Sequence, residues 1–248
     1  MSKKSTRTKE SRLIRTRGIG LSVKLFRLNG TEKGASEIMK VLETYTYQPS
    51  ENNGGAGFKN LKVSGKTVGG EFVASFPVAV LNYDSEGNIM PVHYMSFDRG
   101  EVLVKTDRQT VEVRGSERIA RKFKRVFEEL TGLELSPLNL NGGTLKLYET
   151  ATEIDAVLVT GLDKGNLTQA EFRGSGIQRE DEIGMYTRRY KGQISRFRGT
   201  FPYPSGALLT TTVNTLSGSF TVYKSGDGIL EKDLNWIVEL MENAAHGT

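Results

Sequence analysis

The stretch VLVKTDRQTVEVRGSERIARKFKRVFEEL, from Val102 to Leu130, decides the class of fold. Apolar and polar residues alternate near 101–106 and again near 109–114, which predicts two paired strands with one buried face. From Ser116 onward the apolar residues recur with a helical period and share one side, made of Ile119, Phe123, Val126, Phe127 and Leu130. Ser116 is a suitable N-cap and Gly132 a suitable end. Strands followed directly by a long amphipathic helix predict an α+β fold.

A second helix of the same kind follows the strand SFTVY, Ser219 to Tyr223. It is predicted from about Gly228 to Asn243, with an apolar stripe made of Leu230, Leu234, Ile237, Val238 and Met241. Ahead of the long helices we expect strands near 58–63, 70–82, 91–97, 101–106 and 109–114 in the first half, and near 168–173, 184–190, 193–201, 207–213 and 218–224 in the second. This alternation predicts antiparallel sheets covered by helices on one face and open on the other.

The starts of the two halves also resemble each other. VKLF (Val23–Phe26) and LKLY (Leu145–Tyr148) both alternate like strands, and SEIMKVL (Ser36–Leu42) resembles TEIDAVL (Thr152–Leu158). The second pair predicts two short helices, each capped by its first residue, although 152–162 fits a strand equally well. We therefore expect a disordered basic tail at 1–20, a first α+β repeat with an inserted hairpin near 65–100 at 21–134, a connector at 135–144 and a second α+β repeat at 145–248.

This duplicated order of elements resembles the TATA-box-binding-protein fold, a saddle made of two such halves. That family has a Tyr-Asn-Pro-Glu stretch leading to Phe-Pro-Gly, and YQPSENNGGAGF (Tyr47–Phe58) is similar to it. The family's signature strand pair and helix are resembled by Val102–Leu130, and ALLTTTVNTLSGSFTVYKSG (Ala207–Gly226) has the same place in the second half. The resemblance covers most of 21–245 in the order of elements, with low identity in the motifs. It implies a saddle that binds DNA with its sheet.

The positions with which that family wedges DNA base steps are altered in this sequence. Phe58 loosely matches one wedge position, but the signature-strand positions hold Lys105 and Thr211. A charged or short polar side chain cannot unstack bases as an aromatic ring does. We therefore expect binding of nucleic acid, in particular double-stranded DNA, through backbone electrostatics more than through base wedging.

Positive charge is concentrated in two segments. The net charge of the chain is +5, and residues 1–17 hold seven bases and one acid, or +6, so the rest sums to −1. Within that rest, residues 185–199 have five bases and no acid, which leaves −6 elsewhere. Such concentration favours a polyanionic partner. The candidate contacts in the tail are Lys3, Lys4, Arg7, Arg12, Arg15 and Arg17.

The second basic segment is MYTRRYKGQISRFRG, Met185 to Gly199. If 184–190 is a strand, Tyr186, Arg188 and Tyr190 share one face, and the aromatic rings would stack on bases or sugars. The candidate nucleic-acid contacts here are Tyr186, Arg188, Arg189, Tyr190, Lys191, Arg196 and Arg198, in addition to Phe58 and Lys105 from the first half. The alternative is that the tyrosines lie at the edge of the core and that the arginines pair with the acids of REDE, Arg179–Glu182.

Signals for other functions are sparse. The chain has no cysteine, its two histidines are His93 and His246, and no metal-ligand spacing, cofactor motif or nucleophile motif is present, so we name no catalytic residue and no cofactor. A divergent nuclease and a non-catalytic interaction subunit of a nucleic-acid-processing complex remain as alternatives. We expect an intracellular location without membrane contact, because no apolar run would span a bilayer and no secretory signal is present.

Protein partners, including a second copy of the chain, would use the faces of the two long helices. The first helix has a basic face of Arg118, Arg121, Lys122 and Arg125, and the second an acidic face of Glu231, Asp233, Glu239 and Glu242. Such opposite charges suit head-to-tail association of copies.

Overall fold

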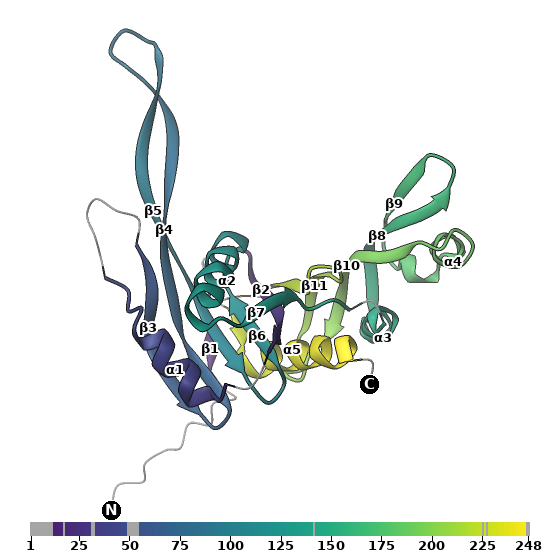
Figure 1. Ribbon diagram of the computed structural model, residues 1–248. Helices are drawn as coiled ribbons and strands as arrows, with labels where there is room; N and C mark the ends of the chain where they lie inside the picture. The colour runs from purple at the N-terminus through teal and green to yellow at the C-terminus, as the bar shows by residue number, and fades with distance from the viewer. Residues whose placement is uncertain are drawn as a thin grey trace, which may run out of the picture. The chain divides into compact units, whose positions relative to one another are not determined.

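The computed structural model describes residues 12–16, 18–30, 33–48, 55–140, 142–224, 226 and 228–246. The class is α+β, as predicted, with antiparallel strands and packed helices (Figure 1). The chain forms two compact units, of which unit 1 is Met1–Leu25 with Pro137–Thr248 and unit 2 is Phe26–Ser136. The division falls inside strand β2 (Gly20–Asn29), so each unit contains part of that strand.

Unit 2 is a sheet covered by two helices. After β2 it contains α1 (Ala35–Glu43), β3 (Ala56–Ser64), β4 (Thr67–Tyr83), β5 (Ile89–Lys105), β6 (Thr110–Arg114) and α2 (Glu117–Thr131), and it ends in β7 (Glu134–Pro137). Its strands lie in the order β3-β4-β5-β6-β2. The core contains Phe72, whose ring centroid lies 5.1 Å from that of Phe58 and 5.6 Å from that of Phe123 on α2.

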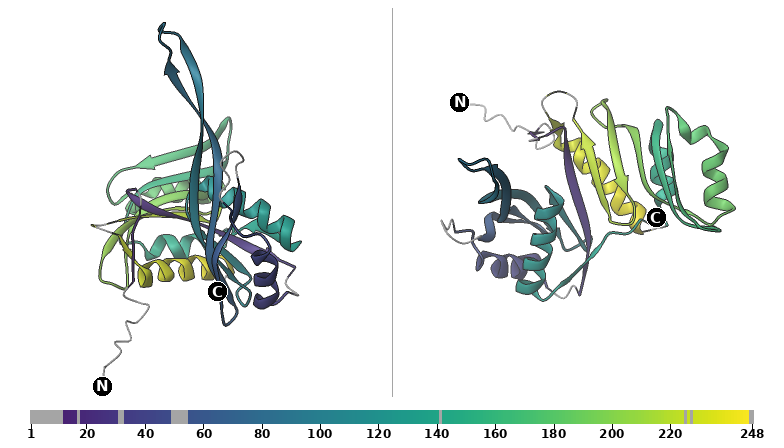
Figure 2. Two further views of the ribbon diagram at one scale, coloured as in Figure 1. Left: turned by 90° about the vertical axis from the view of Figure 1, so that its left-hand side faces the viewer. Right: turned by 90° about the horizontal axis from the view of Figure 1, so that it is seen from above.

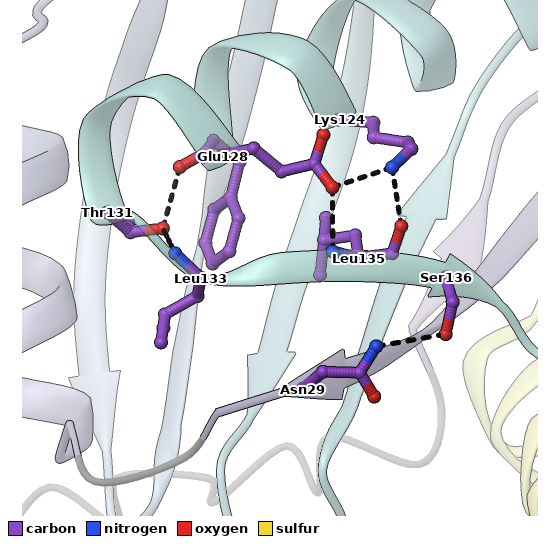
Figure 3. Close-up of polar contacts among 8 residues, drawn as sticks. Asn29, Lys124, Glu128, Thr131, Leu133, Leu135 and Ser136 are labelled. Atoms are coloured by element: carbon purple, nitrogen blue, oxygen red, sulfur yellow. Dashed lines mark hydrogen bonds and ion pairs between the residues drawn. The ribbon is translucent and has the colours of Figure 1, made fainter.

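Local capping explains where α2 begins and ends. The Ser116 hydroxyl accepts a hydrogen bond from the Ile119 N–H at 3.4 Å, as expected of an N-cap. At the other end Gly132 has φ 69°, a left-handed conformation that glycine adopts without a Cβ penalty. The side chains of Glu128 and Lys124 then hold β7 beside the helix: Glu128 accepts from the Leu135 N–H at 2.7 Å, and Lys124 donates to the Leu135 carbonyl at 2.5 Å (Figure 3).

Unit 1 contains the remaining strands of the antiparallel sheet, with helices on one face. It contains β1 (Leu13–Ile14), the first part of β2, α3 (Thr144–Thr150), β8 (Glu153–Lys164), β9 (Leu167–Arg173), the short 3-10 helix η2 (Ile177–Arg179), α4 (Asp181–Arg188), β10 (Gln193–Pro202), β11 (Leu208–Asn214), β12 (Ser219–Tyr223), β13 (Ile229–Leu230) and α5 (Glu231–His246). The strand order is β2-β12-β11-β10-β8-β9, and β1 pairs with β13. The helix α5 lies along this sheet (Figure 2), and its apolar residues Leu234, Ile237 and Met241 share the core with Phe197 and Phe201.

Two short segments predicted as strands are helices. Leu145–Tyr148 lies in α3, where Thr144 and Leu147 are buried and Leu145 is 62% exposed. The segment 184–190 lies largely in α4, which begins with Asp181 and Glu182 at its positive end. In both segments the residues that pack on the core are spaced three or four apart. This spacing matches a helix and not the two-residue alternation of a strand.

Other elements differ from the prediction in type or in bounds. Residues 152–158 belong to strand β8, so the expectation of a short helix there is wrong and the strand alternative is confirmed. The helix α1 begins at Ala35 with Gly34 at its N-cap, rather than with Ser36 as its cap. The strands expected near 91–97 and 101–106 are one strand, β5, which pairs with β4 over its whole length from Thr67↔Lys105 to Tyr83↔Ile89.

Candidate nucleic-acid interface

The sheet of unit 1 separates the basic segment 185–199 onto two faces. Along β10, Phe197 is 1% exposed and points into the helix-covered core. Its neighbours Arg196 and Arg198 have side chains 47% and 50% exposed, because successive side chains of a strand point to opposite faces. The two arginines therefore lie on the open face, whereas their aromatic neighbour stabilises the fold.

Cross-strand pairing aligns polar side chains with Arg198 across this open face. Directly opposed pairs connect Ser22, Thr221, Thr212, Arg198, Ala156 and Arg173, in that order, over six strands. A parallel row two residues away connects Lys24, Ser219, Asn214, Arg196, Leu158 and Glu171. At about 4.8 Å per strand each row spans roughly 24 Å. Hydroxyl and guanidinium groups are the commonest polar groups in these rows, so most of the strands offer a hydrogen-bond donor to the open face.

Two carboxylates position the guanidinium groups. Asp155 accepts a hydrogen bond from Arg198 Nε at 2.7 Å, and this bond, with the attraction of the two charges, raises the pKa of Arg198. Glu171 accepts from Arg173 Nη2 at 3.0 Å and from Arg196 Nη2 at 3.3 Å. These contacts, the Arg173 hydrogen bond first, lower the pKa of Glu171. Each arginine is thus oriented while several of its five N–H donors are not used in these pairs.

The three arginines surround a shallow pocket of about 240 Å³ on the open face. Glu171, Thr212 and Tyr223 contribute to its lining, together with the β8 residues Ala156 and Leu158. The Tyr223 hydroxyl lies 3.4 Å from Thr212 Oγ1. On β8–β12 the charged groups of this site are three bases and two acids, which sum to +1. The arrangement can receive an anionic oxygen between guanidinium groups, the geometry in which arginine binds phosphate and carboxylate.

The tyrosines of the basic segment lie on the other side of the sheet. Tyr186 on α4 packs its ring against Phe172 at 5.3 Å and against Tyr190 at 5.5 Å. Lys164 Nζ lies 4.9 Å and 4.6 Å from the centroids of these two tyrosine rings. The expectation that Tyr186, Arg188 and Tyr190 share one face of a strand is therefore wrong. The alternative placement of the tyrosines at the edge of the core agrees with these contacts.

The other bases of this segment are exposed but are not part of the rows. Arg188 and Arg189 are at the end of α4, and Arg189 lies 5.7 Å from the ring of Tyr190. Lys191 Nζ is 3.8 Å from Asp163 Oδ2. The arginines of β10 pair with Asp155 and Glu171 and not with the acids of Arg179–Glu182, so that expected pairing is corrected.

The candidate residues of the first half are not surface contacts. Phe58 is 1% exposed within the aromatic core of unit 2, so its ring cannot reach a base step. Lys105 has a side chain 17% exposed and pairs with the buried Glu112 at 3.2 Å, which itself pairs with Arg114. Thr211, at the corresponding position in the second half, is fully buried and lies 2.6 Å from the Tyr203 hydroxyl. Both signature-strand positions therefore serve the fold.

Most of the basic tail lies outside the described residues, including Lys3, Lys4, Arg7 and Arg17. Of the tail candidates that are described, Arg12 has its Nη1 atom 3.7 Å from Oε1 of Glu231. The backbone carbonyl of Arg12 also accepts a hydrogen bond from the backbone N–H of Glu231. Arg15 is exposed just after β1. The tail candidates stay a prediction.

The charged helix faces differ from the expected partner surfaces. On α2, Arg121 and Arg125 are exposed and pair with Glu117 and Glu129 one turn away, while Arg118 pairs with Asp98. On α5 the acidic face is largely internal, because Asp233 is 2% and Glu242 1% exposed. The expected head-to-tail association needs an exposed acidic face on α5, and two of its four acids are buried.

Sequence reasoning missed Arg173, Glu171, Asp155 and Tyr223 as members of the site. The available signal was alternation, since Thr210, Thr212, Thr221 and Tyr223 occupy every second position of two neighbouring strands. Among the described residues no group of three or more histidine or acidic side chains is arranged to hold a metal ion. Within the same part of the chain, every helix is too short or too polar to cross a membrane.

Comparison of the sequence with models of known protein families finds no match, and comparison with curated proteins finds no match either.

Proposed function

We propose that the protein binds nucleic acid, in particular double-stranded DNA, through the open sheet face of unit 1. The observation that supports this most directly is the set of guanidinium groups of Arg173, Arg196 and Arg198 around one shallow pocket, in line with a row of hydroxyl groups. Phosphate oxygens are the ligands that such groups contact in nucleic-acid complexes. A row of roughly 24 Å corresponds to about seven nucleotides of one strand.

Contact with the backbone of a duplex is favoured over stacking on single-stranded bases. Single-strand binding proteins use several aromatic platforms. Neither row contains an aromatic residue, and Tyr223 lines only the pocket beside the rows. The rings of Phe58, Tyr186 and Tyr190 pack within their own units, so none of these three side chains is placed to wedge between base steps. Sequence-independent attachment to phosphates fits these side chains best.

The order of elements supports a fold similar to the TATA-box-binding protein. Unit 2 runs strand, helix, four strands, helix and the short strand β7, with β6 and β7 both paired with β2. Unit 1 has a short helix, α3, then antiparallel strands and the long helix α5, with β9, η2 and α4 added between β8 and β10. We propose that the two units are divergent repeats of one such half. The resemblance then implies that the open face of the sheet meets the ligand.

The test is a fluorescence anisotropy titration with duplex DNA, single-stranded DNA and RNA across a salt series. The variant Arg173→Gln/Arg196→Gln/Arg198→Gln should weaken duplex binding and reduce the log–log salt slope by about 2.7, at about 0.9 per phosphate contact. The matched control is Arg121→Gln/Lys122→Gln/Arg125→Gln, which removes the same charge from α2. Equal losses in the two triple variants would contradict the site, and absence of binding to any nucleic acid at low salt would contradict the function.

A non-catalytic interaction subunit is the second candidate function. It is favoured by one observation, the exposed apolar surface of the β4–β5 hairpin, where Leu81 and Tyr83 are each 71% exposed.

A further inference from the structure

The distal part of the β4–β5 hairpin extends beyond the sheet of unit 2 as a two-stranded ribbon. The strand β3 pairs with β4 only as far as Ala56↔Ala74, and β6 pairs with β5 only from Glu101 onward. Among the described residues, no third strand pairs with this part of the hairpin, from Ser75↔Phe97 to Tyr83↔Ile89. Figure 1 shows this ribbon, residues 75–97, projecting past α1 and α2; we call it the arm.

The arm exposes a large apolar surface for a two-stranded ribbon. Its exposed large side chains are Val80, Leu81, Tyr83, Ile89, Met90, Tyr94, Met95 and Phe97, from 39% to 71% exposed. At roughly 100 Å² each they present on the order of 800 Å² over the two faces of the ribbon. Five of them share one face with about 500 Å², the size of the largest and often functional patch on a typical monomer. An isolated two-stranded hairpin is only marginally stable in water, so a partner surface is expected to cover the arm.

The charge of the arm disfavours a nucleic-acid partner. Between residues 75 and 97 the charged side chains are Asp84 and Glu86, both at the tip, and the segment has no lysine or arginine. Architectural proteins that insert apolar side chains into DNA combine them with basic contacts to phosphates. A protein surface is therefore the chemistry that fits the arm.

One face of the arm is more apolar than the other. The pairs Tyr83↔Ile89, Leu81↔Pro91, Ala79↔His93, Pro77↔Met95 and Ser75↔Phe97 place all odd-numbered residues on one face, which we call the odd face. It carries the most exposed apolar residues of the arm, Leu81, Tyr83 and Ile89. The exposed Arg99 continues the same face at the base of the arm, opposite Val73.

A proline interrupts each outer edge of the arm. Pro77 lies on β4, opposite Met95, and Pro91 lies on β5, opposite Leu81. The two pairs are four residues apart along the ladder, so they have the same hydrogen-bonding pattern. A proline within a paired strand sits where its nitrogen points away from the partner strand, so each outer edge lacks an N–H donor. Proline on an edge opposes edge-to-edge pairing. A partner should thus pack on a face of the arm.

We propose that the odd face of the arm packs against the same face of a second copy of this chain, with the two arms antiparallel about a two-fold axis near Ala79 and His93. Five large side chains on this face, at roughly 100 Å² each, would bury about 1,000 Å² over two copies, which is the lower limit for a specific interface. The smaller residues of the face add to this area. The isologous arrangement uses one patch twice, as two-fold dimers do.

Charge complementarity supports the antiparallel direction. A two-fold axis at His93 places Phe97 against the partner's Ile89, and Met95 against the partner's Leu81 and Pro91. The same symmetry brings Arg99 at the base of one arm to Glu86 at the tip of the other, and the reverse pair forms at the far end. A parallel arrangement would instead place the acidic tips together, which like charges oppose.

Sedimentation velocity over a concentration series tests the proposal. The wild type should form a dimer that Leu81→Ser/Tyr83→Ser/Phe97→Ser abolishes. The matched control on the other face, Val80→Ser/Met90→Ser/Tyr94→Ser, changes as many exposed apolar side chains and should still dimerise. A wild type that stays monomeric, or an equal loss of dimer in both variants, would overturn the proposal. Circular dichroism checks that each variant is folded.

Two further variants test the geometry directly. The chain has no cysteine, so His93→Cys introduces a single thiol that lies opposite its own counterpart at the axis. Sheets packed face to face lie about 10 Å apart, which is too far for a disulfide. The His93→Cys variant should therefore be linked into a covalent dimer by a short bis-maleimide reagent. Val80→Cys, on the opposite face, should not. Glu86→Arg and Arg99→Glu should each weaken the dimer at least several-fold, and the double variant should restore it. Cross-linking at position 80 but not 93, or failure of the double variant to recover, contradicts the antiparallel arrangement.

Discussion

Arg198 donates a hydrogen bond from Nε to Oδ1 of Asp155 at 2.7 Å, on the open face of the sheet of unit 1. The side chains are 50% and 33% exposed. Exposed ion pairs of this kind stabilise a fold by only about 0–1 kcal/mol. The pair therefore matters chiefly because it sets the direction of the guanidinium group and reduces the net charge of the surface.

Replacing Asp155 with Asn should strengthen duplex binding while leaving stability nearly unchanged. The change removes one negative charge beside Arg198, and the asparagine oxygen can still accept the hydrogen bond. We expect a several-fold tighter Kd at low salt and a change of less than about 1 kcal/mol in the free energy of unfolding. Anisotropy titrations and urea denaturation measure the two quantities. Asp163→Asn, which removes the same charge beside Lys191, is the control, and an equal gain there would contradict a local effect.

Replacing Phe58 with Ala should destabilise unit 2 strongly. The ring is 1% exposed and contacts the rings of Phe72 and Phe123, so its loss leaves a cavity worth about 3–5 kcal/mol. Urea denaturation should show this loss, whereas Leu145→Ala at a site 62% exposed should change stability by less than about 0.5 kcal/mol. A Phe58→Ala variant of normal stability but weakened DNA binding would restore the wedge interpretation.

Replacing Ser116 with Ala should lower stability by about 0.5–2 kcal/mol at neutral pH, because α2 loses its N-cap. The Ser116 hydroxyl also donates to Asp98 at 2.5 Å. Partial burial of Asp98 raises its pKa, but hydrogen bonds from Ser116 and Arg118 outweigh this, and the pKa is lowered from 3.8.

The sign of the pH dependence follows from that lowered pKa. The contribution of ionised Asp98 is present above its unfolded pKa and is lost as the pH falls through its folded pKa. The Ser116→Ala variant should therefore differ from the wild type most near pH 7 and less near about pH 3. Urea midpoints at both values measure the difference. A Ser116→Ala effect that is independent of pH would show that the cap alone, without the Asp98 contact, accounts for it.

Tyr148 and Tyr203 should respond in opposite ways to substitution by Phe. Burial raises the pKa of Tyr148, and within the described part of the chain its hydroxyl has no hydrogen-bond partner, so Tyr148→Phe should be neutral or stabilise by up to about 1 kcal/mol. Burial also raises the pKa of Tyr203, but its hydroxyl is bonded to the buried Thr211 at 2.6 Å. Tyr203→Phe should therefore cost about 1–3 kcal/mol. Thermal denaturation of the two variants is the measurement, and a larger loss for Tyr148→Phe would contradict the assignment.

Long elements were predictable because many residues agree on one period. The helix α2 has a core stripe over four turns and a cap at each end, and β10, β11 and β12 alternate over at least five residues. Short segments were not predictable. The segments Leu145–Tyr148 and 184–190 have too few residues to distinguish a helical period from the alternation of a strand. Both segments form helices because that conformation packs their apolar residues on the core.

The functional residues divide in the same way. The sequence located the basic segment 185–199, with Arg196 and Arg198 in the strand expected near 193–201. It could not show that Arg173 and Tyr223 join them, because strand order sets those neighbours. Nor could it show that Phe58 is internal, since an apolar residue in a strand has the same local pattern on either face.

The amino-acid sequence by itself determined the α+β class, the two long helices and the concentration of charge, because these depend on periodicity and composition within a segment. The tertiary structure alone decided which face each side chain occupies and which distant residues meet. The physical reason is one of magnitude: local propensities differ by a few tenths of a kcal/mol per residue, whereas burying one large apolar side chain contributes about 1.5–3 kcal/mol.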